Sequence, residues 1–407
     1  MPTYHDIAEL LLKTYRTRPP GLFVKFMLMD APGRRSAIGV TLFRDPALLR
    51  RASLLLVQIE PALFESEPIS SVVSLLEKFF TASTYLIGNN HLFTAMATDV
   101  VLADIAASNA VDLMASGLSA HVREVRALHL HLAPVNRIAP ESNVVSPNLI
   151  VVRGQPHLEL ALSSLPIILP NIQGEGSPPF TFSGRINPVG ADACWIGCLA
   201  NSENSASSKM RRIQGALCMT LPMGEALLFS GDLPLSGKTT IRSDGEMTFN
   251  ASRLFPTLLN PQILSNAMLN DMRDLIDDRI LTGKLRRRVD VALEFIATSW
   301  GSAPRIRFFN NAIAFDALFG VQGQVTKSIV AGVIKHAAAI EKIKTRIEFL
   351  LNMRNALLHG EAASIEEASG YRDYYEQFDV DPISDQQAIL RACLFGLLGR
   401  APANSAP

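Results

Sequence analysis

The chain has 407 residues, of which 48% are hydrophobic and 19% are charged, a globular composition that excludes an intrinsically disordered protein and allows two or three domains. Lys and Arg together number 38 and Asp and Glu also number 38, so no overall basic field indicates a nucleic-acid partner, and any such contact has to come from a local patch. Four cysteines are too few for a disulfide scaffold and fit a reducing cytoplasm.

The N-terminal stretch MPTYHDIAELLLKTYRTRPP is amphipathic but is not typical of a signal peptide, because acidic residues interrupt its apolar part and no small-residue cleavage site follows. The chain also contains no uninterrupted apolar run of about 18 residues, the length of a membrane-spanning helix. We therefore expect a soluble, cytoplasmic protein without a membrane partner.

Residues 1–260 combine short apolar runs, such as GLFVKFMLM and NLIVV, with helical patterns such as ISSVVSLLEKFF. Pro, Gly, Asn and Asp bound the runs, which favours a mixed α/β region. Two turn-rich stretches, at 169–184 and 201–209, predict surface loops or an internal boundary near 175–205.

From residue 261 the character changes to long helical patterns, at 261–281, 284–300, 307–320, 325–359 and 384–399. This change predicts an all-α domain at 261–400, followed by a disordered tail at 401–407. The predicted fold class is therefore α+β, a mixed α/β N-terminal region followed by a helical bundle.

The segment RNALLHG places Arg354, Asn355 and His359 on the last turns of a predicted helix that Gly360 ends as a C-cap. On an ideal helix Asn355 and His359 line one edge of an apolar stripe, and Arg354 falls within the stripe, where its charge needs a partner. Asp316 on another predicted helix is the structural candidate, and a phosphate in a cleft is the functional one. The stripe consists of Ile340, Ile343, Ile347, Leu350, Leu351 and Leu358.

Four other short signals have simpler interpretations. A second Arg-x-x-x-x-His match, Arg126 to His131, lies in a strand-like pattern, where His129 and His131 share one face and are weak candidates for a metal site. The SGKTT sequence lacks phosphate-loop spacing, and the IRSDGEMTFN that follows predicts strand and turn. CWIGC has no second cysteine pair, which favours two packed thiols, and LRRR at 286–288 predicts a solvated helix start.

The C-terminal segments KLRRRVDVALEFIATSW, RIRFFNNAIAFDALFG, IKTRIEFLLNMRNALLHG and QAILRACLFGLLG resemble the Apea-like branch of the HEPN superfamily, over roughly residues 265–400. The resemblance implies a compact helical bundle and a metal-independent endoribonuclease of antiviral defence or toxin systems. The family motif, Arg-polar-x-x-x-His, corresponds to Arg354, Asn355 and His359, followed by Gly360. The family segment Ala-Leu-Glu-x-Leu appears as AFDAL, with Asp316 in place of the glutamate.

Such a site permits a ribose 2′-OH to attack phosphorus without a metal or other cofactor. His359 would transfer protons, Arg354 would stabilise charge and Asn355 would orient the imidazole or the phosphate. Because one histidine can hardly serve both ends of the displacement, and because the family joins two motifs across a dimer, we expect a homodimer through the C-terminal helical domain.

The expected RNA contact is a run of six basic residues from Lys327 to Arg354, with Lys344 as the candidate substrate-binding residue, although a solvated helix face explains this run equally well. The alternative function is a non-catalytic HEPN-like module for dimerisation or partner binding. If the chain is a nuclease, residues 1–260 are expected to sense an unidentified trigger or regulator, or to restrain the nuclease.

Overall fold

A computed structural model gives the fold of most of the chain. It describes residues 2–17, 24–28, 40–64, 67–83, 99–135, 137–153, 163–165, 181–182, 185–186, 194–221, 228–229, 238–243, 245, 247–250, 257–258, 260–277 and 280–400. The predicted tail at 401–407 and most of the predicted loop at 169–184 lie outside these residues. Within the described part, no helix is long and apolar enough to cross a membrane.

The chain divides into two compact units, Met1–Ala127 and Leu128–Pro407. The sequence analysis placed the main boundary near residue 260 instead. The difference arises because the helices after residue 260 share a continuous apolar core with the preceding sheet and helix. Mixed α and β elements and a helical C-terminal region are present, in agreement with the coarse α+β prediction.

The first unit packs helices around one apolar core. Its first helix, α1 (Tyr4–Thr14), begins with a capping box in which Thr3 and Asp6 satisfy each other's backbone N–H groups. α1 contacts α2 (Pro46–Ile59) and α7 (Ala110–Val125), and Tyr15 stacks on Phe80. The other elements are β1 (Tyr15–Arg16), β2 (Val24–Leu28) and β3 (Val40–Arg44), which form a sheet in the order β1-β3-β2, and the helices α3 (Pro61–Phe64), α4 (Ile69–Ser83) and α6 (Leu102–Ile105).

The described residues of the second unit include a six-stranded antiparallel sheet in the order β13-β12-β4-β10-β7-β6. Its central strand, β10 (Cys194–Ala200), is buried throughout and sends alternate side chains into two apolar clusters, one on each face. Gly197 allows β4 to approach, because a Cβ there would lie 2.2 Å from the backbone oxygen of His131. The strands of this sheet besides β10 are β4 (His129–Val135), β6 (Val144–Val145), β7 (Ile150–Arg153), β12 (Lys238–Ile241) and β13 (Met247–Asn250).

The hairpin of β12 and β13 confirms the strand and turn predicted after SGKTT. Short pairs make up the other described strands of the unit. They are β5 (Ile138–Pro140) with β15 (Gln262–Leu264), β8 (Thr181–Phe182) with β9 (Arg185–Ile186), and β11 (Leu228–Phe229) with β14 (Thr257–Leu258).

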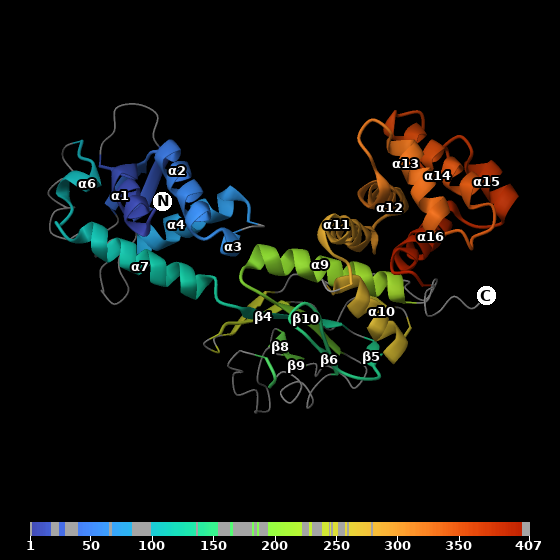
Figure 1. Cartoon of the computed structure of the whole chain (residues 1–407), viewed down its shortest axis with the longest axis horizontal. Coiled ribbons are helices and arrows are strands. Elements are labelled where there is room, and N and C mark those ends of the chain that lie inside the picture. Colours follow the sequence, from blue (N-terminus) through green and yellow to red (C-terminus); the bar gives the residue numbers. More distant parts are fainter. Residues whose placement is uncertain are drawn as a thin grey trace. The chain divides into compact units, whose positions relative to one another are not determined.

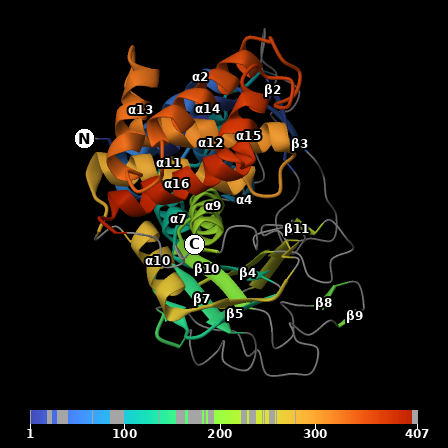
Figure 2. The ribbon, with the colours of Figure 1, turned by 90° about the vertical axis from the view of Figure 1, so that its right-hand side faces the viewer.

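A long helix, α9 (Glu203–Thr220), lies between the sheet and α11 (Gly283–Ser299) (Figures 1 and 2). Gly215 lets the two helices touch, since a Cβ there would lie 2.1 Å from the backbone oxygen of Leu293. α9 begins inside the run 201–209, which was expected to be a loop. That expectation is wrong because Ser202 caps the helix and the polar residues after it form the first turns.

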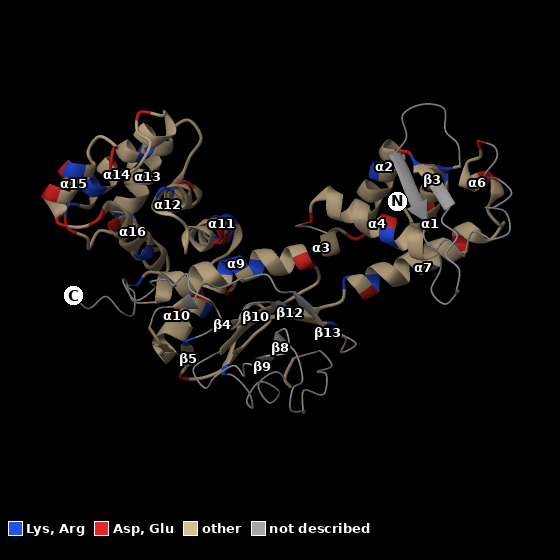
Figure 3. Ribbon diagram, turned by 180° about the vertical axis from the view of Figure 1, so that it is seen from behind, with Lys and Arg blue, Asp and Glu red and all other residues tan. Residues whose placement is uncertain are grey.

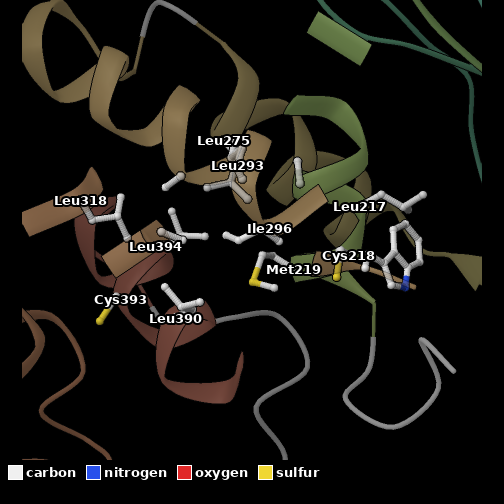
Figure 4. Close-up of a cluster of buried hydrophobic side chains, with 14 of the residues drawn as sticks. Leu217, Cys218, Met219, Leu275, Leu293, Ile296, Leu318, Leu390, Cys393 and Leu394 are labelled. Atoms are coloured by element: carbon white, nitrogen blue, oxygen red, sulfur yellow. The ribbon is translucent and has the colours of Figure 1, made fainter. Parts of the chain in front are cut away.

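The remaining helices enclose the larger part of the apolar core, and Figure 4 shows Leu275, Leu318 and Leu394 from three of them beside side chains of α9 and α11. All four cysteines are buried and none forms a disulfide, which agrees with packed thiols in CWIGC, and burial raises the pKa of Cys218 to about 12. The helices are α10 (Asn266–Ile276), α12 (Pro304–Phe319), α13 (Val325–His336), α14 (Ile343–Leu358), α15 (Tyr371–Phe378) and α16 (Pro382–Leu397).

The predicted helical run 325–359 is two helices, α13 and α14, which pack against each other. The chain turns between them, and Lys342 takes the left-handed conformation with a φ of 53°. Ile340 therefore precedes α14 and is not part of its apolar stripe. The short helix α15 was not predicted, because its sequence, YRDYYEQF, is mostly polar.

Candidate functional site

The motif residues lie at the C-terminal end of α14. The backbone N–H of His359 donates to the carbonyl of Asn355 at 2.9 Å, which completes the last turn. Gly360 then adopts a φ of 74°, a conformation that favours glycine and ends the helix as the sequence suggested. The local sequence thus determines the position of the histidine through the helix and its cap.

Arg354 forms an ion pair with Asp316 of α12, with 3.1 Å between Nη2 and Oδ2. The two side chains are 18% and 29% exposed, so the pair is partly buried. Burial raises the pKa of Asp316, while the charge of Arg354 lowers it by a smaller amount. The other carboxylate oxygen, Oδ1, is buried without a hydrogen-bond partner in the described part of the chain. The carboxylate therefore depends on the arginine for its compensation.

Asn355 and His359 are both exposed and lie one helical turn apart on the same face of α14. Neither side chain makes a hydrogen bond or ion pair with any residue that the structure describes. Leu358, expected in the buried stripe, is 56% exposed. The stripe instead shifts in the last two turns toward Met353, Ala356 and Leu357, because that face, rather than the Leu358 face, meets the core.

Exposed aliphatic side chains lie at this end of α14 and on α12, a helix that contacts α14. Two contacts place the last turn and the following loop beside α12, namely the Arg354–Asp316 pair and a hydrogen bond of 2.8 Å from Arg305 Nη1 to the carbonyl of Ala363. On α12, Ile306 is 53% exposed and Ile313, two turns later on the same face, is 38% exposed. We call Ile306, Ile313 and Leu358 the apolar border of the motif.

The basic run from Lys327 to Arg354 is not one continuous face of unpaired cations. Lys344 Nζ lies 4.0 Å from Glu348, and its side chain is 68% exposed. Arg346 is instead turned inward, where it pairs with Asp385 of α16 and lies 4.4 Å above the ring of Phe378. The expectation of an RNA-facing run therefore does not extend to Arg346, which is part of the packing among α14, α15 and α16.

The second Arg-x-x-x-x-His match is not a site of the same kind. Arg126 follows α7 and forms a buried ion pair with Glu67 at 3.1 Å. His131 lies in the middle of β4, as the strand pattern predicted, and its Nδ1 is 3.0 Å from Thr240 Oγ1. The two residues belong to different elements, a helix end and a strand.

The LRRR run at the start of α11 is only partly solvated, so the sequence expectation for it is wrong at two of three positions. Arg286 is 7% exposed, and its Nη1 donates to the carbonyl of Leu275 at 2.6 Å. Arg288 donates to the carbonyls of Leu318 and Gly320, each at 2.9 Å, and so caps the end of α12. Arg287 alone of the three is exposed. Arg286 and Arg288 are turned inward because their guanidinium groups donate to backbone carbonyls at the ends of α10 and α12.

Sequence analysis missed a cluster of charges where α9 meets α11. Lys209 and Arg212 of α9 lie at a pocket that Asp290 of α11 also lines. The residues come from segments far apart in the chain, so their proximity could not be inferred from the sequence. The sequence shows only two basic residues three positions apart on one helix and two acidic residues, at 290 and 294, on another.

Among the residues with described positions, no group of three or more His, Cys, Asp or Glu side chains could hold a metal ion. Comparisons with protein-family models, curated proteins and solved structures find no match for this chain. The assignment of a function therefore depends on the geometry of the motif and on the residues that surround it.

Proposed function

We propose that the chain is a metal-independent endoribonuclease that cleaves single-stranded RNA, with Arg354, Asn355 and His359 as its catalytic residues. The observation that carries the proposal is the exposure of Asn355 and His359 on one face at the end of α14, the helix that also carries the guanidinium group of Arg354. A proton-transferring group, an amide and a cation at one accessible helix end suit phosphodiester cleavage. The resemblance to HEPN ribonucleases supports the same residues.

In the proposed reaction the ribose 2′-OH attacks the adjacent phosphorus while the bond to the 5′-oxygen breaks. One imidazole accepts the proton of the 2′-OH, and an imidazolium donates a proton to the leaving 5′-oxygen. Arg354 stabilises the charge on the phosphoryl oxygens, and Asn355 orients the phosphate. The products are a 2′,3′-cyclic phosphate and a 5′-hydroxyl, so neither a metal ion nor a water molecule takes part in this step.

The reaction needs two proton-transferring groups, and each chain supplies one His359. We therefore propose a homodimer in which two copies of the motif form one composite site. The apolar border of the motif, Ile306, Ile313 and Leu358, supports this arrangement, because exposed aliphatic side chains next to polar site residues are typical of interface surfaces. A trigger or regulator acting through residues 1–260, and a role in defence or toxicity, belong to the same proposal.

The ion pair of Arg354 with Asp316 favours a second candidate, a non-catalytic helical module for dimerisation or partner binding. In this function the arginine charge is already compensated within the chain, and the motif residues only cover the end of α14. The two candidates differ in whether His359 is required for any chemistry.

The decisive experiment compares the wild-type protein with His359→Ala on single-stranded RNA in EDTA. We expect wild-type cleavage with cyclic-phosphate ends and a loss of about 10²-fold or more in the variant, the usual effect of removing an acid–base group. Folding should lose only about 1 kcal/mol, because His359 lies at an exposed helix end. His5→Ala, which removes a histidine that is also exposed, serves as the matched control and should retain full activity.

Wild-type cleavage that requires a divalent metal, or full activity of His359→Ala, would contradict the proposed mechanism. The non-catalytic module would then be the better account. Light scattering on both proteins, with and without RNA, tests the homodimer separately, because a module could dimerise without cleaving.

A further inference from the structure

A small pocket in the second unit lies where the sheet, α9, α10 and α11 meet. It is lined by Asn148, Lys209, Arg212, Ile276 and Asp290, and its cavity volume is about 50 Å³. This volume is well below that of typical small-molecule sites, about 300–1,000 Å³, but it exceeds the roughly 10–15 Å³ that one water molecule needs. The pocket therefore suits a compact group better than a whole nucleotide.

The lysine of the pocket has no acidic partner among the described residues. Lys209 Nζ donates to Asn148 Oδ1 at 3.0 Å and to the carbonyl of Leu199 at 2.9 Å. Both acceptors are neutral, and no carboxylate of the described residues lies within 4.0 Å of this ammonium group. A half-buried cation held by neutral acceptors is an unusual arrangement, because its charge has lost part of its hydration without gaining a counter-ion.

The arginine of the pocket belongs to a network in which carboxylates are scarce. Arg212 reaches Asp290 with Nη1 at 3.1 Å and Glu294 with Nε at 3.0 Å. Each carboxylate also has a second arginine, with Arg286 Nε 2.9 Å from Asp290 and Arg211 Nε 3.9 Å from Glu294. Three arginines thus share two carboxylates, and with the charge of the pocket lysine the cluster carries a formal net charge of +2. Figure 3 shows the basic residues of α9 along the middle of the helix.

A purely structural role explains part of this network, because the arginine pairs join α9 to α11. It does not explain the lysine or the donors that remain. Lys209 uses two of its three N–H groups. Arg212 uses three of its five N–H groups, two for the carboxylates and one, on Nη2, that donates to Ser208 Oγ at 3.0 Å. Three N–H groups on two pocket cations are therefore available to an anionic ligand.

We infer that this pocket binds a phosphate group of the backbone of single-stranded RNA, an inference that rests on the proposed function. A phosphodiester carries one negative charge and accepts several hydrogen bonds, which matches the surplus charge and the three donors of the pocket. Because the contact is to the backbone, it positions the RNA without reading its sequence. The site thus adds a binding contact on α9, outside the helix that carries the motif.

The test measures the affinity of the full-length protein for fluorescently labelled single-stranded RNA with 2′-O-methyl riboses, which cannot be cleaved through 2′-OH attack. Lys209→Met should weaken binding and reduce the slope of log affinity against log salt by about 0.7, the value for one lost phosphate contact on a single strand. Lys209→Arg, which keeps the charge, should restore most of the slope. Lys78→Met, at an exposed lysine in the first unit, is the control and should leave both quantities unchanged.

An unchanged salt slope in folded Lys209→Met, with normal RNA binding, overturns the inference and leaves the proposed nuclease intact. If Lys209→Met does not fold, an unchanged slope in a folded Lys209→Gln variant, which also removes the charge, overturns it equally. Thermal melting in inorganic phosphate measures anion binding by the folded protein, since a ligand of the native state raises the melting temperature. A wild-type protein that phosphate stabilises but that binds no RNA overturns both the RNA assignment of the pocket and the proposed function.

Discussion

Replacement of Arg354 by alanine should destabilise the fold in a pH-dependent way, because it removes the counter-ion of Asp316. The carboxylate is 29% exposed, and its Oδ1 has no hydrogen-bond partner among the described residues. Exposed ion pairs contribute about 0.2–1 kcal/mol, and removal of one partner from a fully buried pair costs about 3–5 kcal/mol. For this partly buried pair we expect a coupling energy of about 1–2 kcal/mol at neutral pH.

The sign of the pH dependence follows from the pKa of Asp316. Burial raises this pKa above its ordinary value of 3.8, so the folded state loses stability as the pH rises through the raised value and the carboxyl ionises. Arg354 limits this loss by lowering the pKa. Without the arginine, ionisation of Asp316 becomes more costly, so the destabilisation of Arg354→Ala should grow from acid to neutral pH.

A double-mutant cycle of Arg354→Ala and Asp316→Ala, measured by urea unfolding at neutral pH and near pH 3.8, tests this reasoning. The coupling energy should be present at neutral pH and smaller at the lower pH, because protonation removes the charge that Arg354 compensates. Arg287→Ala, at an exposed arginine of α11, is the control for loss of an arginine. A coupling energy below about 0.3 kcal/mol at neutral pH, or one that does not change with pH, would refute the structural importance of the pair.

Two further predictions concern the packing of the second unit. Gly215→Ala should lower the free energy of unfolding by about 1–3 kcal/mol, because the new methyl group would clash with the backbone of α11. This loss is expected even though alanine has a better helix propensity than glycine. A urea titration that shows stabilisation would contradict the contact. Tyr374→Phe should cost about 1.5–3 kcal/mol in the same assay, since it removes a buried hydrogen bond to the carboxylate of Asp385. The neighbouring Tyr375→Phe, at a side chain 49% exposed, should cost almost nothing, and equal losses in both variants would exclude a specific role for the buried hydroxyl.

Local structure was accessible to sequence reasoning where neighbouring residues determine it. The end of α14 follows from a helical pattern and a glycine, and the β12–β13 hairpin follows from its alternation and turn residues. The partner of Arg354 was also inferable, because a guanidinium inside an apolar stripe requires an acid and Asp316 is an acid in an otherwise apolar helix. These inferences need only the chemistry of short segments.

Long-range packing was not accessible in the same way. Residues 128–407 form one unit, without a boundary near 260, because α9 joins the sheet to α11. Gly215 allows the two helices to touch, but the sequence alone does not distinguish it from any other glycine. Leu358 looked buried because an ideal helix wheel assumes that one face meets the core along the whole length, whereas the last turns of α14 present another face. The pocket at Lys209 likewise brings together residues from positions 148 to 290.

The two candidate functions also differ in whether RNA binding changes the protonation of Asp316, the partner of Arg354. An RNA phosphate that approaches Arg354 brings a second negative charge close to Asp316, and repulsion between them favours the protonated carboxyl, whose pKa burial already raises. In the proposed nuclease, RNA binding is therefore coupled to proton uptake at Asp316, and affinity should increase as the pH falls toward the pKa of this carboxyl. In a non-catalytic module no phosphate reaches the arginine, so the same pair couples pH to stability alone.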